Sequence, residues 1–179
     1  MPLLKNHYTS EDYWNLPEGE RAELIDGKFY DMAPPSRIHQ KLVFAISRII
    51  GNYIADHHGS CEVYPAPFAV NLDADDKDWV EPDISVICDP DKLTDRGCSG
   101  APDLIFEIVS PSSRKLDYGI KNGIYSQSGV REYWIVDPAK DRITVWDLRN
   151  DNNDEFSFSD KVKAGIYDDL YIDFSTIQL

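Results

Sequence analysis

Two acidic residues lie inside runs of residues that are otherwise suited to a protein core. Asp83 follows Pro82 and precedes Ile84-Ser85-Val86-Ile87, and Glu107 lies within Leu104-Ile105-Phe106-Glu107-Ile108-Val109. A buried carboxylate must be hydrogen-bonded, paired with a positive charge or protonated. Two such groups on adjacent strands repel each other unless something positive lies between them. The pattern therefore predicts a cation between Asp83 and Glu107, and a divalent metal ion is the simplest one.

Both acids also have a plain structural interpretation. Asp83 could cap the turn at the start of its strand, and Glu107 could form a salt bridge with Arg131 or Lys121. Asp103 adds an ambiguity, because it follows a proline just as Asp83 does. It precedes Glu107 by four residues and lies at the remote end of the same strand, which makes a shared ion less natural. We therefore prefer Asp83 as the partner of Glu107.

A lysine that could serve this site lies in the second predicted helix. Lys121 stands at the border of an apolar stripe of Leu116, Ile120 and Ile124, so its side chain can reach the sheet. The simpler interpretation is an exposed helix pair with Asp117, four residues earlier, which would contribute only about 0.3 to 0.5 kcal/mol. The sequence leaves both interpretations open.

The first elements of the chain are expected to carry one further acid. Ser10 could cap a short helix through Asn15, and the residues from 22 to 30 predict a hairpin that turns at Asp26-Gly27. Glu23 lies in the first strand of this hairpin. Its plain interpretation is a polar residue near a turn.

A long amphipathic helix is predicted after this hairpin. Ser36 is its expected N-cap, and His39 lies in its first turn. The helix is expected to stop near His57-His58-Gly59, where Gly59 permits a left-handed exit and a histidine suits the negative helix end. The positive end of the helix disfavours a charged His39, so a neutral hydrogen-bond donor or acceptor is expected there.

The remaining elements predict strands on both sides of one helix. The second helix starts near Ser110-Pro111-Ser112-Ser113 and ends at Gly129, and an acidic tip at residues 151–154 and a short β tail to Phe174 follow later. Extended segments are predicted at residues 61–72, 80–88, 104–109, 132–136 and 143–148. A strand, a helix and a strand at this spacing indicate a right-handed crossover that places the strand of Glu107 beside segment 132–136. The pattern predicts a single α/β domain over residues 1–179, with a central mixed β-sheet flanked by helices.

The charge of the chain weighs against a nucleic-acid partner. The formal net charge is −14, whereas phosphate binding normally draws on a basic surface. Basic residues nevertheless gather in the second half of the chain, so the sequence allows a local positive rim beside an acidic site. These residues are Arg114, Lys115, Lys121, Arg131, Lys140, Arg142 and Arg149.

Cysteine use and hydropathy give expectations about location. Cys61, Cys88 and Cys98 are odd in number and lack the paired spacing of a zinc site, so we expect core or surface thiols rather than disulfides. No apolar stretch approaches the length of a membrane span, and the N-terminus lacks the long apolar region of a signal peptide. We therefore expect no membrane partner and a cytoplasmic location.

Several motifs in a fixed order carry a resemblance that spans most of the chain. They are Glu23-Leu24-Ile25-Asp26-Gly27, Pro35-Ser36 with His39, Pro82-Asp83-Ile84-Ser85-Val86, the segment from Ala101 to Ser113, Asp117, Lys121, Tyr125 and the segment from Gly129 to Asp137. Together they closely resemble the Uma-two family, cyanobacteria-rich proteins with the restriction-endonuclease-like fold of the PD-(D/E)XK nuclease superfamily. The order and spacing carry the resemblance, since no single motif is specific.

The resemblance implies a metal-dependent endonuclease that hydrolyses phosphodiester bonds of DNA. In PD-(D/E)XK nucleases an acid after proline and a second acid on the next strand hold a divalent ion. Here these would be Asp83 and Glu107, joined by the backbone carbonyl of Ile108, and oxygen ligands suit Mg²⁺ or Mn²⁺. Val109 occupies the position of the family's lysine, and Lys121 on the neighbouring helix is the implied substitute.

The resemblance also implies further site residues and a partner. Glu23 is similar to the N-terminal acid that such folds bring to the same metal cluster, and His39 belongs to the motif set. The implied catalytic residues are therefore Asp83, Glu107, Lys121, Glu23 and His39. Enzymes of this fold often pair so that two sites address two strands, which implies a homodimer.

Two other classes of function compete with a nuclease. A non-catalytic interaction or metal-binding module that retains the fold would suit the acidic surface better. Serine or cysteine hydrolysis is disfavoured, because the sequence has no nucleophile elbow and no cysteine in an activating context.

Overall fold

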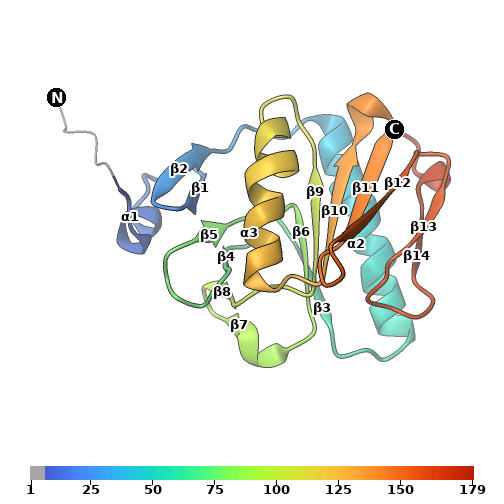
Figure 1. The fold of residues 1–179 in the computed structure, drawn as a ribbon, viewed down its shortest axis with the longest axis horizontal. Helices are drawn as coiled ribbons and strands as arrows, with labels where there is room; N and C mark the ends of the chain where they lie inside the picture. Colours follow the sequence, from blue (N-terminus) through green and yellow to red (C-terminus); the bar gives the residue numbers. More distant parts are fainter. Residues whose placement is uncertain (1–6) are drawn as a thin grey trace.

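The computed structural model describes residues 7–179, and a six-stranded mixed β-sheet forms its centre (Figure 1). The strand order is β12-β11-β10-β9-β6-β3. The strands are β3 (Glu62–Pro65), β6 (Ile84–Ile87), β9 (Leu104–Ile108), β10 (Glu132–Asp137), β11 (Arg142–Asp147) and β12 (Asn152–Phe156). Strands β9 and β10 are parallel and adjacent, as the strand–helix–strand pattern predicts, and Glu107 is paired with Ile135.

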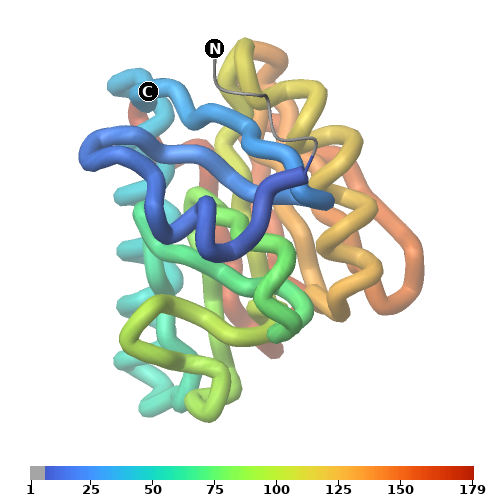
Figure 2. The backbone as a smooth tube through the Cα atoms, turned by 90° about the vertical axis from the view of Figure 1, so that its left-hand side faces the viewer, coloured from blue at the N-terminus to red at the C-terminus, as the bar shows by residue number. Residues whose placement is uncertain are grey.

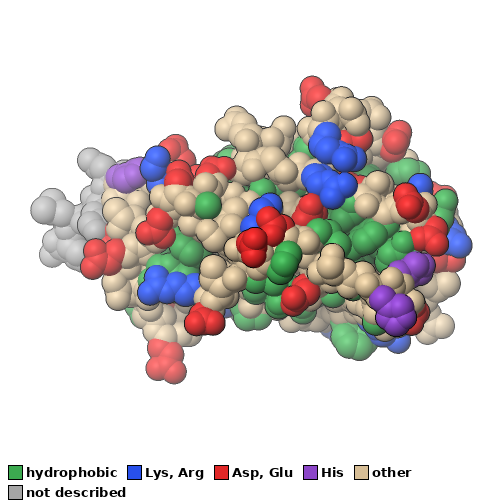
Figure 3. Space-filling model, turned by 90° about the horizontal axis from the view of Figure 1, so that it is seen from below, with side chains coloured by type: hydrophobic (Ala, Val, Ile, Leu, Met, Phe, Trp, Pro, Cys, Tyr) green, Lys and Arg blue, Asp and Glu red, His purple; other side chains and the backbone are tan. Residues whose placement is uncertain are grey.

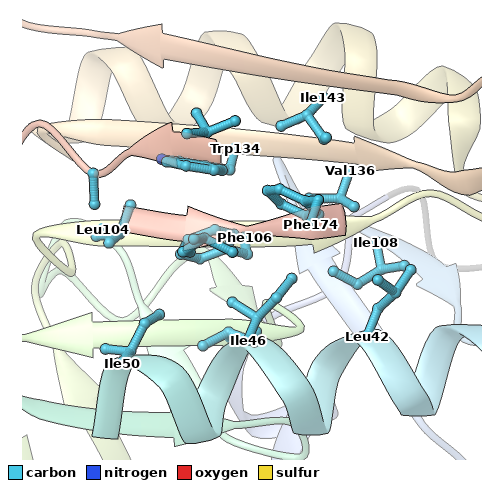
Figure 4. Packing of buried hydrophobic residues seen from close by; sticks show 14 of the residues in the cluster. Leu42, Ile46, Ile50, Leu104, Phe106, Ile108, Trp134, Val136, Ile143 and Phe174 are labelled. Atoms are coloured by element: carbon cyan, nitrogen blue, oxygen red, sulfur yellow. The ribbon is translucent and has the colours of Figure 1, made fainter. Parts of the chain in front are cut away.

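One face of this sheet is covered by the long helix α2 (Arg37–Asp56). Its residues at spacings of four, Leu42, Ile46 and Ile50, are fully buried and point toward the sheet (Figure 4). They pack against Phe106 and Trp134, which share this face because side chains alternate along each strand. The two-stranded hairpin of β13 (Lys161–Lys163) and β14 (Tyr171–Asp173) closes the same core, followed by a 3₁₀ turn at Phe174–Thr176.

The opposite face of the sheet is covered by α3 (Lys121–Ser128). Figure 2 shows α2 and α3 on opposite sides of the molecule. Tyr125 of α3 stacks edge-on against Tyr133 of β10, with 4.9 Å between ring centroids, inside a second buried cluster. Because Glu107 lies two residues from Ile105 of this cluster, its side chain points to the face that α3 covers. This alternation places a carboxylate between sheet and helix.

A π-helical turn (Leu116–Ile120) leads directly into α3. The backbone N–H of Lys121 donates to the Leu116 carbonyl, five residues earlier, instead of to the usual partner four residues earlier. Helix α3 then ends at Gly129 in the left-handed conformation, where the sequence predicts its end.

A second sheet carries the N-terminal hairpin, in strand order β2-β1-β5-β4-β8-β7. Its strands are β1 (Ala22–Ile25), β2 (Lys28–Asp31), β4 (Val70–Asn71), β5 (Trp79–Val80), β7 (Leu93–Thr94) and β8 (Gly97–Ser99). The hairpin of β1 and β2 turns at Asp26-Gly27 as predicted, with positive φ at both residues. Helix α1 (Ser10–Trp14) packs beside it, and 3₁₀ turns cover Pro90–Lys92 and Pro138–Lys140.

Several predicted boundaries are wrong. The extended segments 61–72 and 80–88 each split into two short strands in different sheets, and β7 and β8 have no counterpart in the prediction. Residues 152–154, expected in a turn, belong to strand β12, where pairing with β11 outweighs their polar composition. The tip of that hairpin lies earlier, at Asp151.

Two helix caps also differ from the expectation. Thr9, not Ser10, caps α1, because the Thr9 side chain accepts from the Asp12 N–H while the Asp12 carboxylate accepts from the Thr9 N–H. The left-handed residue after α2 is His58 rather than Gly59. Ser36 caps α2 as predicted. At the other, negative end of the helix, His57 Nδ1 lies 2.9 Å from the Tyr53 carbonyl oxygen.

The expectation of three free thiols is wrong. Cys61 and Cys88 form a disulfide. Glu62 of β3 pairs with Ile87 of β6 in antiparallel register, so Cys61, just before Glu62, lies opposite Cys88, just after Ile87. Only that register, not a short motif, brings the two cysteines together. Cys98 is a free, buried thiol. Among residues 7–179, no helix is long and apolar enough to span a membrane.

Candidate active site

Asp83 lies at the start of β6, directly across from Glu107 on β9. The antiparallel register pairs Ile84 with Phe106, which brings the preceding and following acids side by side. Asp83 Oδ2 accepts the Ile108 backbone N–H at 2.7 Å and lies 3.1 Å from His39 Nε2. The carboxylate oxygen is the acceptor in this hydrogen bond, so we assign the ring proton of His39 to Nε2. His39 therefore orients the Asp83 carboxylate from the first turn of α2.

Glu107 is bound from α3 by two residues one turn apart. Lys121 Nζ donates to Glu107 Oε1 at 2.8 Å, and the Tyr125 hydroxyl donates to the same oxygen at 2.7 Å. All three side chains are almost completely buried. The simpler interpretation, an exposed pair of Asp117 and Lys121, is therefore wrong, because the π-helical turn and α3 direct the two side chains toward the sheet.

The ammonium of Lys121 is shared among three carboxylates. Besides Glu107, it lies 2.9 Å from Glu23 Oε2 and 3.7 Å from Asp117 Oδ1. The other oxygen of Glu23 accepts the backbone N–H of Glu81 at 2.9 Å. Both Glu23 oxygens are thus bound within the protein, and hairpin strand β1 is tied to α3 through this acid.

The charges of this cluster do not balance. Glu23, Asp83, Glu107 and Asp117 are all buried, and Lys121 is the buried lysine among them. Burial raises the pKa of Glu107 well above its usual range, the Lys121 ammonium opposes this, and the Asp83 and Asp117 charges add to it. Burial alone would lower the pKa of Lys121, but the charges of Glu107, Glu23 and Asp117 raise it well above its usual range. The surplus negative charge favours uptake of a further cation or a proton.

The cluster lines a cleft of about 1110 Å³. Every predicted site residue borders it, namely Glu23, His39, Asp83, Glu107, Ile108 and Lys121. Asp103, the competing acid, does not line it. Its carboxylate pairs with Arg131 at 3.2 Å and accepts the Cys88 backbone N–H at 2.8 Å, which leaves it a structural role.

The donor set fits a hard cation with few protein ligands. Among the described residues, the hydrogen bonds to the Asp83 carboxylate all go to Oδ2, and those to the Glu107 carboxylate all go to Oε1. The lone pairs of Asp83 Oδ1 and Glu107 Oε2 are therefore available to a metal ion. No three His, Cys, Asp or Glu side chains within residues 7–179 form a ready-made metal site. Mg²⁺ often binds through one or two carboxylates, with water and substrate phosphates completing its shell. Two acids with one unengaged oxygen each suit that mode.

Sequence reasoning assigned no site role to two residues that the structure brings into the cluster. Asp117 and Tyr125 flank Lys121 at intervals of four residues, and the three side chains share one face of the helix. That spacing was the available signal. Its weakness is that an acid and a lysine at this spacing are common on exposed helices.

A solved structure shares this architecture. The structure of a "putative nuclease belonging to DUF820" from Anabaena variabilis superimposes with a TM-score of 0.69 and covers 88% of this chain and 89% of that one. The two sequences are 21% identical, so the likeness defines the fold. It confirms the restriction-endonuclease-like α/β class, with a mixed central sheet flanked by helices.

The family follows from the sequence match. Residues 10–163 match the model of the family described as "Uma2: Putative restriction endonuclease", and the chain belongs to this family. Two Synechocystis proteins are similar. One, slr1290, is 26% identical over 147 residues, which is 80% of this chain and 75% of that protein. The other, sll1609, is 29% identical over 121 residues, which is 66% of this chain and 67% of that protein.

Proposed function

We propose that this protein is a Mg²⁺- or Mn²⁺-dependent endonuclease that hydrolyses phosphodiester bonds of DNA at the cleft. The family and fold support nuclease chemistry in general. The observation that carries the finer proposal is the surplus of buried carboxylates, of which Asp83 and Glu107 each keep one oxygen unengaged. A buried surplus of negative charge is stable only with a cation or bound protons.

Asp83 and Glu107 would hold the ion, and the Ile108 carbonyl is the proposed third protein ligand. When bound, such an ion lowers the pKa of an attacking water and neutralises charge on the phosphate. Neighbouring residues of the chain would hold the two carboxylates in place for the ion. The His39 ring and the Ile108 N–H fix the Asp83 carboxylate, while the Tyr125 hydroxyl fixes Glu107. Binding then requires little reorganisation of either acid.

Lys121 would bring the positive charge that acts on the substrate. Lys121 lines the cleft, and there its ammonium would donate a hydrogen bond to a phosphate oxygen or to the attacking water. Glu23 would hold this ammonium at the level of the acids, since it contacts Lys121 and the Glu81 backbone at the same time. We therefore assign Glu23 to positioning.

Cleavage of supercoiled plasmid DNA tests the proposal. With Mg²⁺ or Mn²⁺ the wild-type protein should nick the plasmid, and Asp83→Asn, Glu107→Gln and Lys121→Ala should each lower the rate at least about 100-fold. Asp103→Asn is the matched control, because it also alters an acid after proline but lies outside the cleft. It should keep most of the activity. Circular dichroism must show that each variant is folded.

A non-catalytic metal-binding module is the second candidate, and the net charge of −14 favours it. Titration calorimetry with Mn²⁺ separates the two functions. Binding that is lost in Asp83→Asn and Glu107→Gln, without any cleavage of DNA or RNA, would support the module. Cleavage that persists in both variants would refute the proposed site.

Two remaining parts of the proposal concern assembly and location. We propose that two copies pair so that two sites address the two strands, and that the protein works in the cytoplasm. Analytical ultracentrifugation with and without duplex DNA tests the pairing, and a monomer under both conditions contradicts it.

A further inference from the structure

Lys121 and an incoming metal ion would compete for Glu107. The ammonium lies 2.8 Å from Glu107 Oε1, and a divalent cation on the same carboxylate would repel it. The Lys121 ammonium would then be stabilised mainly by its two other carboxylate partners, Glu23 at 2.9 Å and Asp117 at 3.7 Å. Glu23 already shares its charge with a backbone N–H, whereas Asp117 does not.

The Asp117 carboxylate is held near Lys121 without strong partners of its own. Its side chain is 1% exposed and borders the cleft. Neither carboxylate oxygen makes a hydrogen bond of good geometry among the described residues, and the Ser113 hydroxyl nearby gives only a weaker interaction, which lowers the pKa of the carboxyl less than Lys121 does. A buried carboxylate in this state is costly and needs an explanation. Lys121 at 3.7 Å is its nearby cation.

The backbone around Asp117 is fixed by an unusual device. Within the π-helical turn, the Lys121 N–H goes to Leu116, so the Asp117 carbonyl does not receive this bond. The buried Tyr133 hydroxyl on β10 donates to that carbonyl at 3.0 Å instead. Asp117 is thereby anchored to the sheet beside Glu107. Single π-helical turns of this kind occur frequently at functional sites.

We propose that Asp117 is a positioning residue, the counter-ion that keeps the Lys121 ammonium in the cleft when a divalent cation takes Glu107. This inference rests on the proposed function. In the free protein Asp117 is a loosely compensated charge, and in the metal-loaded protein it becomes a main partner of Lys121. Asp117 acts through Lys121 and is not a ligand of the ion.

A double-mutant cycle on Mn²⁺ affinity, measured by calorimetry without substrate, tests this coupling. Asp117→Asn should weaken Mn²⁺ binding about tenfold, because Lys121 then stays on Glu107 and opposes the ion. In a Lys121→Met background the competition is gone, so adding Asp117→Asn should change the affinity by less than about twofold. Lys121→Gln replaces Lys121→Met if the latter does not fold, since its amide still donates to Glu107. Asp117→Glu, which keeps the charge, should restore most of the affinity.

The outcomes separate this inference from the proposed function. If Mn²⁺ binds through Asp83 and Glu107 but Asp117→Asn weakens it equally in both backgrounds, Asp117 is a ligand and the positioning role is overturned. If Asp117→Asn has no effect in either background, the inference also fails while the proposed function stands. If the wild-type protein binds no Mn²⁺, both fail together.

Discussion

At the scale of single residues, Asp117 is a buried carboxyl group whose charged form is unfavourable in the folded protein. Burial raises the pKa of Asp117 from its ordinary value of 3.8 to about 6, although the Lys121 charge and a weak hydrogen bond from Ser113 act in the opposite direction. The folded state therefore holds a proton that the unfolded chain releases at lower pH. By linkage, this group contributes a loss of stability as the pH rises from about 4 to about 6.

Replacing Asp117 by asparagine should remove that loss. We expect the free energy of unfolding of Asp117→Asn at pH 7 to exceed that of the wild type by about 1 to 3 kcal/mol, and the difference to shrink below pH 4. Urea denaturation of both proteins from pH 4 to pH 7 measures this. Asp103→Asn is the comparison, because it breaks the pair with Arg131 and should destabilise. A variant Asp117→Asn less stable than wild type at pH 7 would contradict the account.

At the scale of elements, the π-helical turn and α3 together bring three functional side chains to β9. Asp117, Lys121 and Tyr125 follow one another at helical spacing, so the position of the helix along the sheet decides whether they meet Glu107. Residues 114–115 are already helical, the π-helical turn follows them, and α3 then stops at Gly129, whose φ is 91°. Its C-terminal stop is thus set by a backbone conformation that other residues adopt with difficulty.

Two glycines of this helix give a matched pair of variants. A Cβ at Gly123 or at Gly129 would have no atom within 4 Å, so neither substitution causes a clash. Gly129→Ala should lower the free energy of unfolding by about 1 kcal/mol, because alanine resists the left-handed conformation. Gly123→Ala lies inside the helix and should raise it by about 0.5 to 1 kcal/mol. Chemical denaturation checks both, and equal signs for the two variants would refute the assigned helix end.

At the scale of the whole molecule, the acidic charge is spread over the surface as well as concentrated in the cleft. Figure 3 shows acidic side chains scattered across one face, interspersed with fewer basic ones. The formal net charge is −14, so the folded state carries long-range self-repulsion. Salt screens such exposed charges, whereas buried pairs are screened much less.

The melting temperature should therefore rise with salt. We expect an increase of a few degrees between about 20 mM and 300 mM NaCl, because screening relieves the surface repulsion. MgCl₂ at matched ionic strength should stabilise the wild type further if the cleft binds the ion. The variant carrying Asp83→Asn and Glu107→Gln separates the two effects. It should keep the response to NaCl and lose the extra response to Mg²⁺, whereas an unchanged Mg²⁺ response would place the ion elsewhere.

Features that depend on local pattern can be read from the amino-acid sequence. Runs of alternating or continuous apolar residues located β6, β9 and β10, and capping and breaking residues located α2 and the end of α3. Asp83 and Glu107 were recognisable because a carboxylate among core residues is costly wherever it occurs. The order of motifs gave the family, which the match over residues 10–163 confirms.

Which side chains meet depends instead on how the elements pack. Glu23 reaches Lys121 because the hairpin of the second sheet lies against α3, and Cys61 joins Cys88 because of the register between β3 and β6. In the sequence Asp117 looks like half of an ordinary surface pair. The packing of its helical segment on the sheet buries its carboxylate, with Lys121 3.7 Å away. Long-range pairing depends on how elements pack, and no window of sequence contains the residues on both sides of such a contact.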